Sequence, residues 1–369
     1  MANKLSHSSA RMLSECGRKY KFHYVDRLRE YNSSAALVFG SAIDSAINHL
    51  LEHRDVTAAI AAFNKAWLNA RVAGDRAESF LPTNERIVYA KSDFDRDLLQ
   101  EADYEFISNE MGIQNEPKLL FSMFQDAQDM KMSMGFNKMA SGARRIHNLF
   151  YWVCLRHKGA LMVDAYFKKV LPRIKEVHAV QKAIELEDDK GNKITGFIDA
   201  IVTWEDGKKY VVETKTSSIE YSRDAAKVSQ QLILYYHAEK EEYGLDGVGF
   251  VVLRKGIIKN KTKVCSKCNH DGSSASHKTC PNVVDGSRCH GEWTLGMDPQ
   301  VDVNFIFDKV YPQVEQLVMD NFSLLNQKVD AKIFEANLGA CTQSYGKCQY
   351  YSLCYFGSKE GLVEIPKEE

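Results

Sequence analysis

The 369-residue sequence lacks several features that would place it in particular classes of protein. It contains no continuous apolar run of about 18 residues, the length that a membrane-spanning helix needs, and its first residues hold no apolar signal core. It also has no excess of charge, because 48 Lys and Arg residues stand against 49 Asp and Glu residues. We therefore expect a cytoplasmic protein with no membrane partner, on which any nucleic-acid-binding surface is local.

Cysteine, in contrast, is present in unusual number, with nine residues in an otherwise ordinary globular composition. In a chain without a secretion signal, clustered cysteines suggest metal ligation before disulfides. One cluster is formed by Cys265, Cys268, Cys280 and Cys289, and a second by Cys341, Cys348 and Cys354. Cys16 stands alone, and Cys154 lies between Trp152 and Leu155, which predicts a buried thiol.

Hydrophobic periodicity changes along the chain. Roughly the first 160 residues are predicted to be mostly helical, with helices at about Ala10–Phe22, after a Ser6–Ser9 cap, and at Ala35–His53. From Ile174 the runs and turn signals predict an antiparallel meander of three strands, then a helix and a further strand. A cysteine-rich loop at Val264–Trp293 interrupts this order, and a long helix is expected at about Asn304–Gln327.

Charged residues stand in the predicted meander where core residues are expected. The segment 196–217 reads GFIDAIVTWEDGKKYVVETKTS, so a tight turn between the last two strands would bring Asp199 beside Glu213. Two close carboxylates repel one another unless a cation lies between them. Mg²⁺ and Mn²⁺ accept such oxygens, and the carbonyl of Thr214 is a plausible third ligand.

Lys215 follows Glu213 by two residues and therefore points to the same face of its strand. Its ammonium could orient water and stabilise charge on a phosphate, so the set suits metal-assisted phosphodiester hydrolysis. An exposed Glu–Lys pair on a surface hairpin is the simpler alternative, although the flanking residues look buried and buried charges need partners.

These motifs together resemble the RecB-like branch of the PD-(D/E)XK nuclease superfamily, which includes RecB and AddB nuclease domains, the CRISPR adaptation nuclease with an iron–sulfur cluster, and many phage nucleases. The resemblance is carried by GFID, VVETKT, QLILY, FGSAID and the opening LSHSSARMLSECGRKYKFHYVDRL. It extends from about Leu5 to Phe356 and leaves the cysteine-rich insertion outside. It implies an α/β fold, with a restriction-endonuclease-like core built on a mixed sheet.

The resemblance also implies roles for individual residues. Asp199 and Glu213 would be metal ligands and Lys215 the catalytic lysine. Gln231 and Tyr235, one helical turn apart, would contact DNA near the scissile phosphate, although Tyr235 could equally be a core aromatic residue. The position of the family's histidine ligand is taken by Asp44, which suits Mg²⁺ as an oxygen ligand or is merely an exposed helix residue.

By the same resemblance, Cys16 on the first helix would join the C-terminal cysteines around a 4Fe–4S cluster. The spacing C-x6-C-x5-C has a longer first gap than the family's usual C-x2-C-x5-C. A zinc ion in the same cage, or free thiols, are alternatives. Part of a DNA-binding face, or an ordinary helix surface, would come from Lys4, Arg11, Arg18, Lys19 and Lys21, with Tyr20 and Phe22 interleaved.

The insertion has the spacing C-x2-C-x11-C-x8-C and few apolar residues, so it could not fold by burial alone. Cys265, Cys268, Cys280 and Cys289 predict a zinc-ribbon-like site, in which His277 or His290 could replace a cysteine. The insertion is either a structural excursion or a finger that binds DNA or a partner. Some phosphate affinity, or only a solvated face, would come from Lys259, Lys261, Lys263 and Lys267.

The sequence therefore predicts a Mg²⁺- or Mn²⁺-dependent deoxyribonuclease, first of all an exonuclease on DNA ends or single strands. Recombination, repair or phage DNA metabolism would be its setting, the cytoplasm of a bacterial or phage-infected cell its location, and a helicase or recombination protein a partner. A non-catalytic DNA-binding or assembly subunit is the main alternative, and a zinc-binding interaction protein is another. We expect a helical N-terminal section (1–172), a nuclease core (173–262), a zinc-binding insertion (263–295) and a C-terminal helix with a cysteine clasp (296–369).

Overall fold

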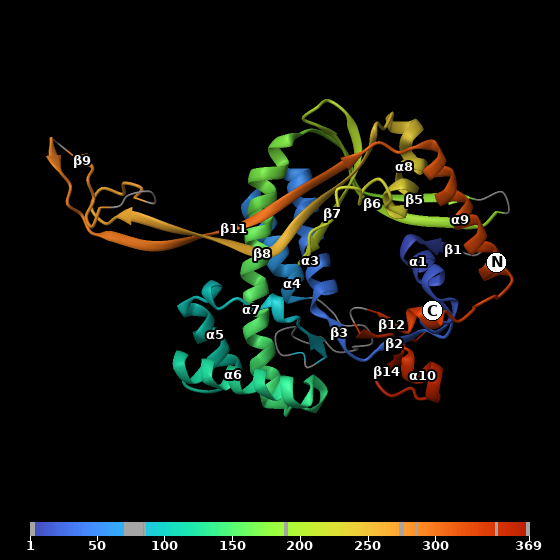
Figure 1. Ribbon diagram of the computed structural model, residues 1–369, viewed down its shortest axis with the longest axis horizontal. Coiled ribbons are helices and arrows are strands. Elements are labelled where there is room, and N and C mark those ends of the chain that lie inside the picture. The colour runs from blue at the N-terminus through green and yellow to red at the C-terminus, as the bar shows by residue number, and fades with distance from the viewer. Residues whose placement is uncertain are drawn as a thin grey trace.

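A mixed six-stranded sheet forms the centre of the computed structural model (Figure 1), which describes residues 4–69, 84, 86–187, 191–272, 277–284, 286–343 and 346–366. The strand order is β1-β6-β7-β8-β11, with β5 paired to β6. The sheet is mixed because β1 runs parallel to β6 and β7 parallel to β8, whereas the other pairs are antiparallel. The strands are β1 (Lys4–Ser6), β5 (Ile174–Glu187), β6 (Lys193–Trp204), β7 (Lys209–Ser217), β8 (Gly247–Cys265) and β11 (Trp293–Asp308).

The predicted meander is confirmed, with β5, β6 and β7 followed by the helix α8 (Gln230–Tyr243) and the strand β8. The two faces of the sheet bury alternate residues of the same strands, as the two-residue period of a strand requires. On β7, Val212 packs into one hydrophobic cluster and Val211 into the other. Because β7 is covered on both faces, polar residues in its middle, such as Glu213, are buried.

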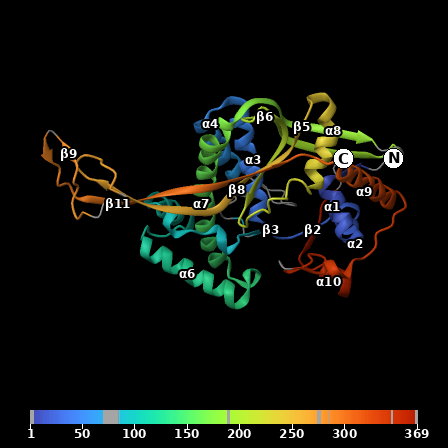
Figure 2. The same ribbon diagram turned by 45° about the horizontal axis from the view of Figure 1, so that its top comes forward.

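One face of the sheet is covered by a helical layer and the other by fewer helices (Figures 1 and 2). The helical layer is formed by α3 (Ala35–His53), α4 (Val56–Leu68), α5 (Glu101–Met111), α6 (Pro117–Met134) and α7 (Ser141–Ala165). The opposite face packs against α8, α9 (Pro312–Asp330) and the N-terminal helix α1 (His7–Glu15). None of the described helices combines the length and the apolar character needed to cross a membrane.

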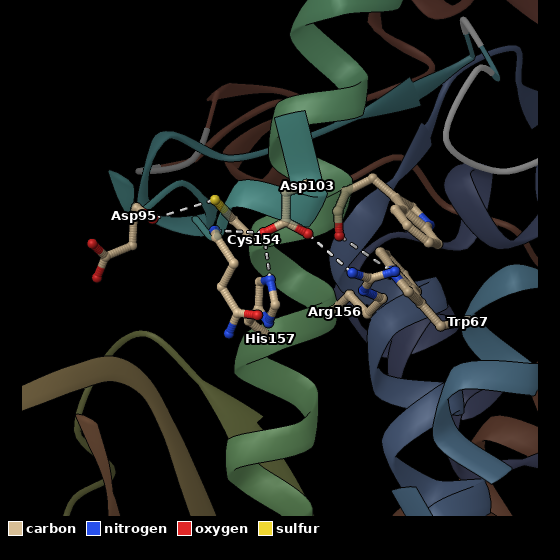
Figure 3. A network of polar contacts seen from close by, with 8 residues as sticks. Trp67, Asp95, Asp103, Cys154, Arg156 and His157 are labelled. Carbon is tan, nitrogen blue, oxygen red and sulfur yellow. Dashed lines mark hydrogen bonds and ion pairs between the residues drawn. The ribbon is translucent and has the colours of Figure 1, made fainter. Parts of the chain in front are cut away.

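A buried polar network fixes the helical layer (Figure 3). The Asp103 side chain is 1% exposed and binds Arg156 at 3.0 Å and His157 at 2.7 Å, both on α7. Cys154, on the same helix, is buried as predicted, and its thiol donates to the backbone carbonyl of Asp95 at 3.3 Å. Burial raises the pKa of this thiol to about 12, so Cys154 is a packing residue and not a reactive thiolate.

The predicted helix Ala10–Phe22 is wrong in its bounds, because the helical conformation is interrupted at Cys16. The Ser6 hydroxyl caps α1 by accepting from the Ser9 N–H at 3.2 Å, and the helix ends at Cys16, which is extended. A short helix α2 (Gly17–Tyr20) and a π-helical turn (Lys21–Val25) follow. The break lets Gly17 lie against the backbone near Glu335, where an added Cβ would be 2.7 Å from a nitrogen.

The predicted helix Asn304–Gln327 is also wrong in its first part. Val303 to Asp308 pair with β8 in register, and the helix α9 begins only at Pro312. Alternating residues in VDVNFIFD give the two-residue period of a strand, and Pro312 at the first helical position sets the true start.

Strands β8 and β11 continue beyond the sheet as a two-stranded ribbon, so the excursion is longer than the predicted loop 264–293. We call residues 256–300 the arm, of which 273–276 and 285 lie outside the described residues. Both views show the arm projecting away from the rest of the protein, with β9 (Val283–Val284) and β10 (Ser287–Arg288) near its tip (Figures 1 and 2).

The two ends of the chain meet on the side of the protein opposite the arm. β14 (Leu362–Glu364) pairs with β2 (Leu28–Glu30), and Tyr350 donates to the Leu28 carbonyl at 2.8 Å. Other short elements are β3 (Ser33–Ser34), β4 (Ile87–Val88), β12 (Thr342–Gln343), β13 (Gly346–Lys347), α10 (Tyr351–Phe356), a π-helical turn (Tyr166–Val170) and 3₁₀ turns (Lys91–Asp93, Arg96–Leu98, Phe136–Lys138, Leu171–Arg173, Leu338–Ala340).

Candidate active site and cysteine sites

The structure brings together the charged residues that the sequence placed in the meander. Ala200 pairs with Val212 between β6 and β7, so the next position along the strands sets Asp199 beside Glu213. The backbone N–H of Thr214 donates to Asp199 Oδ2 at 3.0 Å. Glu213 is 4% exposed and Thr214 7% exposed, which rules out a surface hairpin for this part of β7.

Glu213 is the centre of a hydrogen-bonded group. Its Oε1 pairs with Lys215 Nζ and accepts from Gln231 Nε2 at 2.9 Å, while Gln231 also donates to the Tyr235 hydroxyl at 3.3 Å. The other oxygen, Oε2, is buried and has no hydrogen-bond partner in the described part of the chain. A buried carboxylate oxygen without a donor is costly, and a bound cation would satisfy it.

Tyr235 is both a member of this group and a core residue. It is 4% exposed. Its ring packs so closely on Gly196 that a Cβ added to this glycine would lie 2.6 Å from a carbon of the tyrosine ring. The glycine of the GFID motif is therefore needed for the tyrosine to pack over β6. The hydroxyl still reaches Gln231, so the two interpretations of Tyr235 are compatible.

Asp44 faces the same site from α3 and is partly buried, not an exposed helix residue. Burial raises the pKa of its carboxyl to about 6; Lys215 opposes this rise and Glu213 adds to it. Burial, then Glu213 and Asp44, raise the pKa of Asp199 to about 8. Neighbouring carboxylates thus destabilise the charged forms of Asp44 and Asp199, as expected of oxygens arranged around a cation.

Lys215 stays charged within this group. Burial lowers its pKa, but the Glu213 carboxylate more than compensates, so that the pKa lies above its ordinary value. Its side chain lines an open cleft together with residues of the N-terminal helix and of α8. The lining includes His7, Arg11, Tyr221, Gln231 and Phe250.

Two residues near the site escaped the sequence analysis. Gln181 on β5 donates to Asp199 Oδ1 at 3.5 Å and to Asn48 at 3.4 Å, and it has a left-handed φ of 49°. His7 lies beside Lys215, and burial, then Arg11 and Lys215, lower its pKa to about 4. Gln181 stands in none of the motifs that carry the resemblance, and His7 stands in the opening segment without an assigned role, because only the sheet topology brings them to the site.

The basic face predicted on the first helices is dispersed. Lys19 pairs with Glu15 at 3.0 Å and Lys21 with Asp26 at 2.7 Å, and neither lysine is among the residues that line the cleft. Tyr20 is buried, and Phe22 lies against Tyr350 with ring centroids 5.5 Å apart. Of the predicted set, Arg11 lies in the cleft, Arg18 lines a different cavity, and the side chain of Lys4 lies outside the described part.

The four insertion cysteines form a tight group near the end of the arm. Their sulfur atoms all lie within 4.8 Å of one another, with Cys265 and Cys289 3.5 Å apart and Cys268 and Cys280 3.7 Å apart. Tetrahedral zinc with Zn–S bonds of about 2.3 Å sets its sulfur ligands about 3.8 Å apart. The spacing fits a single metal ion, and neither His277 nor His290 belongs to the group.

The remaining predicted cysteines, from both ends of the chain, line one cavity of about 110 Å³, formed with Arg18, Lys19 and Tyr350. Its cysteines are Cys16, Cys341, Cys348 and Cys354. The long first gap of C-x6-C-x5-C is explained by the β12–β13 hairpin, across which the Cys348 N–H donates to the Cys341 carbonyl at 2.9 Å. Among the described residues, only the arm cysteines form a group within 4.8 Å, so these four sulfurs are more widely spaced.

Two carboxylates and a lysine lie on adjacent strands of a mixed sheet, next to the point where the β6–β7 pairing ends and beside an open cleft, an arrangement suited to metal-dependent phosphodiester hydrolysis. The chain belongs to the PD-(D/E)XK nuclease superfamily, whose model matches residues 4–122 and 138–355. A search among curated proteins finds no match. The crystal structure of SSO0001 aligns with 62% of this chain and with 77% of the SSO0001 chain, at 12% sequence identity. The TM-score of 0.22 is too low to show a shared fold.

Proposed function

We propose that the protein hydrolyses DNA phosphodiester bonds with Mg²⁺ or Mn²⁺ at the site around Glu213. The observation that carries the proposal is the buried Glu213 Oε2, which has no hydrogen-bond partner in the described chain and lies in a site with two further carboxyl groups. The donor set of three carboxylates and a backbone carbonyl is the set that hard divalent cations prefer.

The ligands in this proposal are Asp44, Asp199, Glu213 and the carbonyl of Thr214. When bound, the ion would lower the pKa of a coordinated water and offset charge on the phosphate. The protein holds these ligands in place, because the Thr214 N–H binds Asp199 and Gln231 binds Glu213. Lys215 brings a permanent positive charge to the cleft wall, where the phosphate of the substrate would lie.

We further propose that the protein belongs to the RecB-like branch and holds a 4Fe–4S cluster at Cys16, Cys341, Cys348 and Cys354. Three observations support this assignment. The four cysteines line one cavity, their sulfurs are spaced more widely than a single zinc ion requires, and Arg18 and Lys19 line the same cavity and would offset thiolate charge.

For the arm we propose a zinc ion held by Cys265, Cys268, Cys280 and Cys289. The sulfur spacing supports zinc, and the surroundings explain the need for it. The tip has few buried apolar residues, with Val283 63% and Leu295 77% exposed, so hydrophobic burial alone would not hold it.

The mode of attack that we propose is exonucleolytic, on DNA ends or single strands. The test is digestion of end-labelled linear and covalently closed circular DNA, single- and double-stranded, with Mg²⁺ or Mn²⁺. We expect progressive shortening of linear DNA and intact circles. Cleavage of circles at the rate of linear DNA would assign an endonuclease, and no hydrolysis of any substrate would favour a non-catalytic subunit.

A further inference from the structure

The arm starts at the same end of the sheet as the proposed active site. Lys215 on β7 pairs with Val252 on β8, and β8 then continues without interruption to Cys265. At a rise of about 3.3 Å per residue, the 13 residues between Val252 and Cys265 span roughly 40 Å. One strand therefore links the neighbour of the catalytic lysine to the cysteine group near the tip.

The base of the arm is fixed to the helical layer by charged groups. Lys259 binds Asp95 at 2.7 Å and Asp97 at 2.5 Å, and Lys255, which is 5% exposed, lies 3.6 Å from Asp93. The backbone of Asp95 is in turn held by Cys154 of α7 (Figure 3). These contacts set the direction of the arm relative to the active site, so the tip is a positioned surface.

The arm carries a positive charge that the whole chain does not have. Between residues 256 and 300 there are six Lys and Arg residues against four Asp and Glu residues, although the whole chain has a net charge of −1. Three of the basic residues, Lys267, Lys278 and Arg288, lie exposed near the tip. A local positive patch on an otherwise balanced protein fits a polyanion.

Beyond its base, the described part of the arm contributes few side chains to the core. Trp293 is the largest side chain near the cysteine group, where its ring packs on Gly272 and under Lys263 at 4.8 Å. Two large apolar side chains of the ribbon are exposed, Leu295 at 77% and Ile258 at 49%. A projecting, metal-stabilised and positively charged ribbon is therefore best explained by what it contacts outside the protein.

We propose that the tip of the arm binds the phosphate backbone of duplex DNA flanking the cleavage site. Roughly 40 Å corresponds to about 12 base pairs at 3.4 Å per pair, and a duplex this short is stiff enough to run straight from the cleft to the tip. The proposal rests on the proposed nuclease function. According to this proposal, only a duplex that extends about 12 base pairs from the cleft reaches the tip of the arm.

The test compares binding of 8-base-pair and 30-base-pair fluorescent duplexes by anisotropy, without added Mg²⁺ or Mn²⁺. The arm variant is Lys267→Gln, Lys278→Gln and Arg288→Gln. The matched control is Lys65→Gln, Lys118→Gln and Lys138→Gln, which removes the same charge from exposed positions of the helical layer. Zinc content and melting temperature establish that each variant is folded.

We expect the arm variant to bind the 30-base-pair duplex about tenfold more weakly than the wild type. The slope of log K against log salt should become shallower by up to about 2.7, because each of the three lost phosphate contacts contributes about 0.9. Binding of the 8-base-pair duplex, and all binding by the control, should match the wild type. Wild-type affinity of the arm variant for the long duplex would overturn the proposal and point to a protein partner. An equal loss on the short duplex would overturn the assigned distance.

This experiment separates the arm from the active site, because binding is measured without cleavage. If the wild type binds the long duplex through the arm but hydrolyses no DNA, the arm proposal stands and the proposed nuclease function fails. If the wild type hydrolyses DNA and the arm variant binds and cuts long duplexes like the wild type, the proposed nuclease function stands and the arm proposal fails.

Discussion

Gln231 donates a hydrogen bond of 2.9 Å to Glu213, and this contact ties helix α8 to strand β7 at the proposed active site. It leaves Glu213 Oε2 as the oxygen without a donor. The pair explains why a glutamine stands among the apolar residues of α8, next to the buried Leu232 and Ile233. In this account Gln231 positions the carboxylate, while Lys215 and the carboxylates act on the substrate and the metal.

Replacement of Gln231 by Ala should lower kcat about tenfold to a hundredfold, because Glu213 loses the donor that fixes its rotamer. Gln231→Glu should be worse, since it adds a fourth carboxylate. The measurement is single-turnover cleavage across a Mg²⁺ titration, with Gln230→Ala on the same helix as the control. Unchanged metal dependence in Gln231→Ala would return the glutamine to a structural role.

Asp44→Asn should raise the Mg²⁺ concentration required for half-maximal cleavage, because it removes one negative ligand from the site. Asp26→Asn, which alters a surface ion pair with Lys21, is the control and should leave the titration unchanged. Identical titrations for Asp44→Asn and the wild type would remove Asp44 from the metal site.

The pKa values predict how pH affects the metal-free protein. The folded state raises the pKa of Asp44 to about 6 and that of Asp199 to about 8, above the ordinary value of 3.8. These two carboxyl groups therefore bind more protons in the folded state than in the unfolded state between about pH 4 and pH 8, so their contribution to stability falls as pH rises through that window. A bound cation offsets this loss.

The check is the melting temperature with and without Mg²⁺ at pH 5 and pH 8. The gain from Mg²⁺ should be larger at pH 8, and Asp199→Asn without metal should melt above the wild type at pH 8. An equal Mg²⁺ gain at both pH values would mean that these carboxyl groups do not face the ion.

Cys265→Ser with Cys268→Ser should remove one zinc ion per chain by elemental analysis and weaken binding of long duplexes as much as we expect of the arm variant. Hydrolysis of short substrates should persist, because the catalytic residues lie on the core part of the sheet. Retention of the full zinc content would show that other residues hold the metal.

Gly17→Ala should reduce iron incorporation below the expected four atoms per chain in anaerobically purified protein. The added methyl group would lie 2.7 Å from the Glu335 backbone and push Cys16 away from the other three cysteines. Gly142→Ala, where nothing lies within 4 Å of the new Cβ, is the control. Colourless wild-type protein with two zinc ions per chain would contradict the iron assignment.

Local patterns were sufficient to predict the meander, the helix after it and the neighbourhood of Asp199 and Glu213. The two-residue period and a short turn determine that geometry within about 20 residues. The start of α9 is predicted too early, although the two-residue period of VDVNFIFD and the proline at position 312 both indicate a strand before the helix. The break at Cys16 was missed because it depends on the distant Glu335, whose carbonyl accepts from the Arg18 N–H at 3.2 Å.

Long-range packing explains the remaining differences. Gln181 reaches the site through strand order, which no local motif encodes. The arm was predicted as a loop because its strands continue β8 and β11 past the core, where apolar alternation ends and lysines begin. The basic run after Cys16 was predicted as one surface, but its lysines form local ion pairs.

The most direct test of the account is the cleavage rate of Lys215→Ala on end-labelled DNA with Mg²⁺ or Mn²⁺. Lys209→Ala, on the same strand but bonded to the Tyr243 carbonyl, is the matched control. The account predicts a loss of at least about a hundredfold for Lys215→Ala, since the charge beside the phosphate is removed, and wild-type cleavage for the control. Cleavage by folded Lys215→Ala at the wild-type rate would contradict the assigned active site.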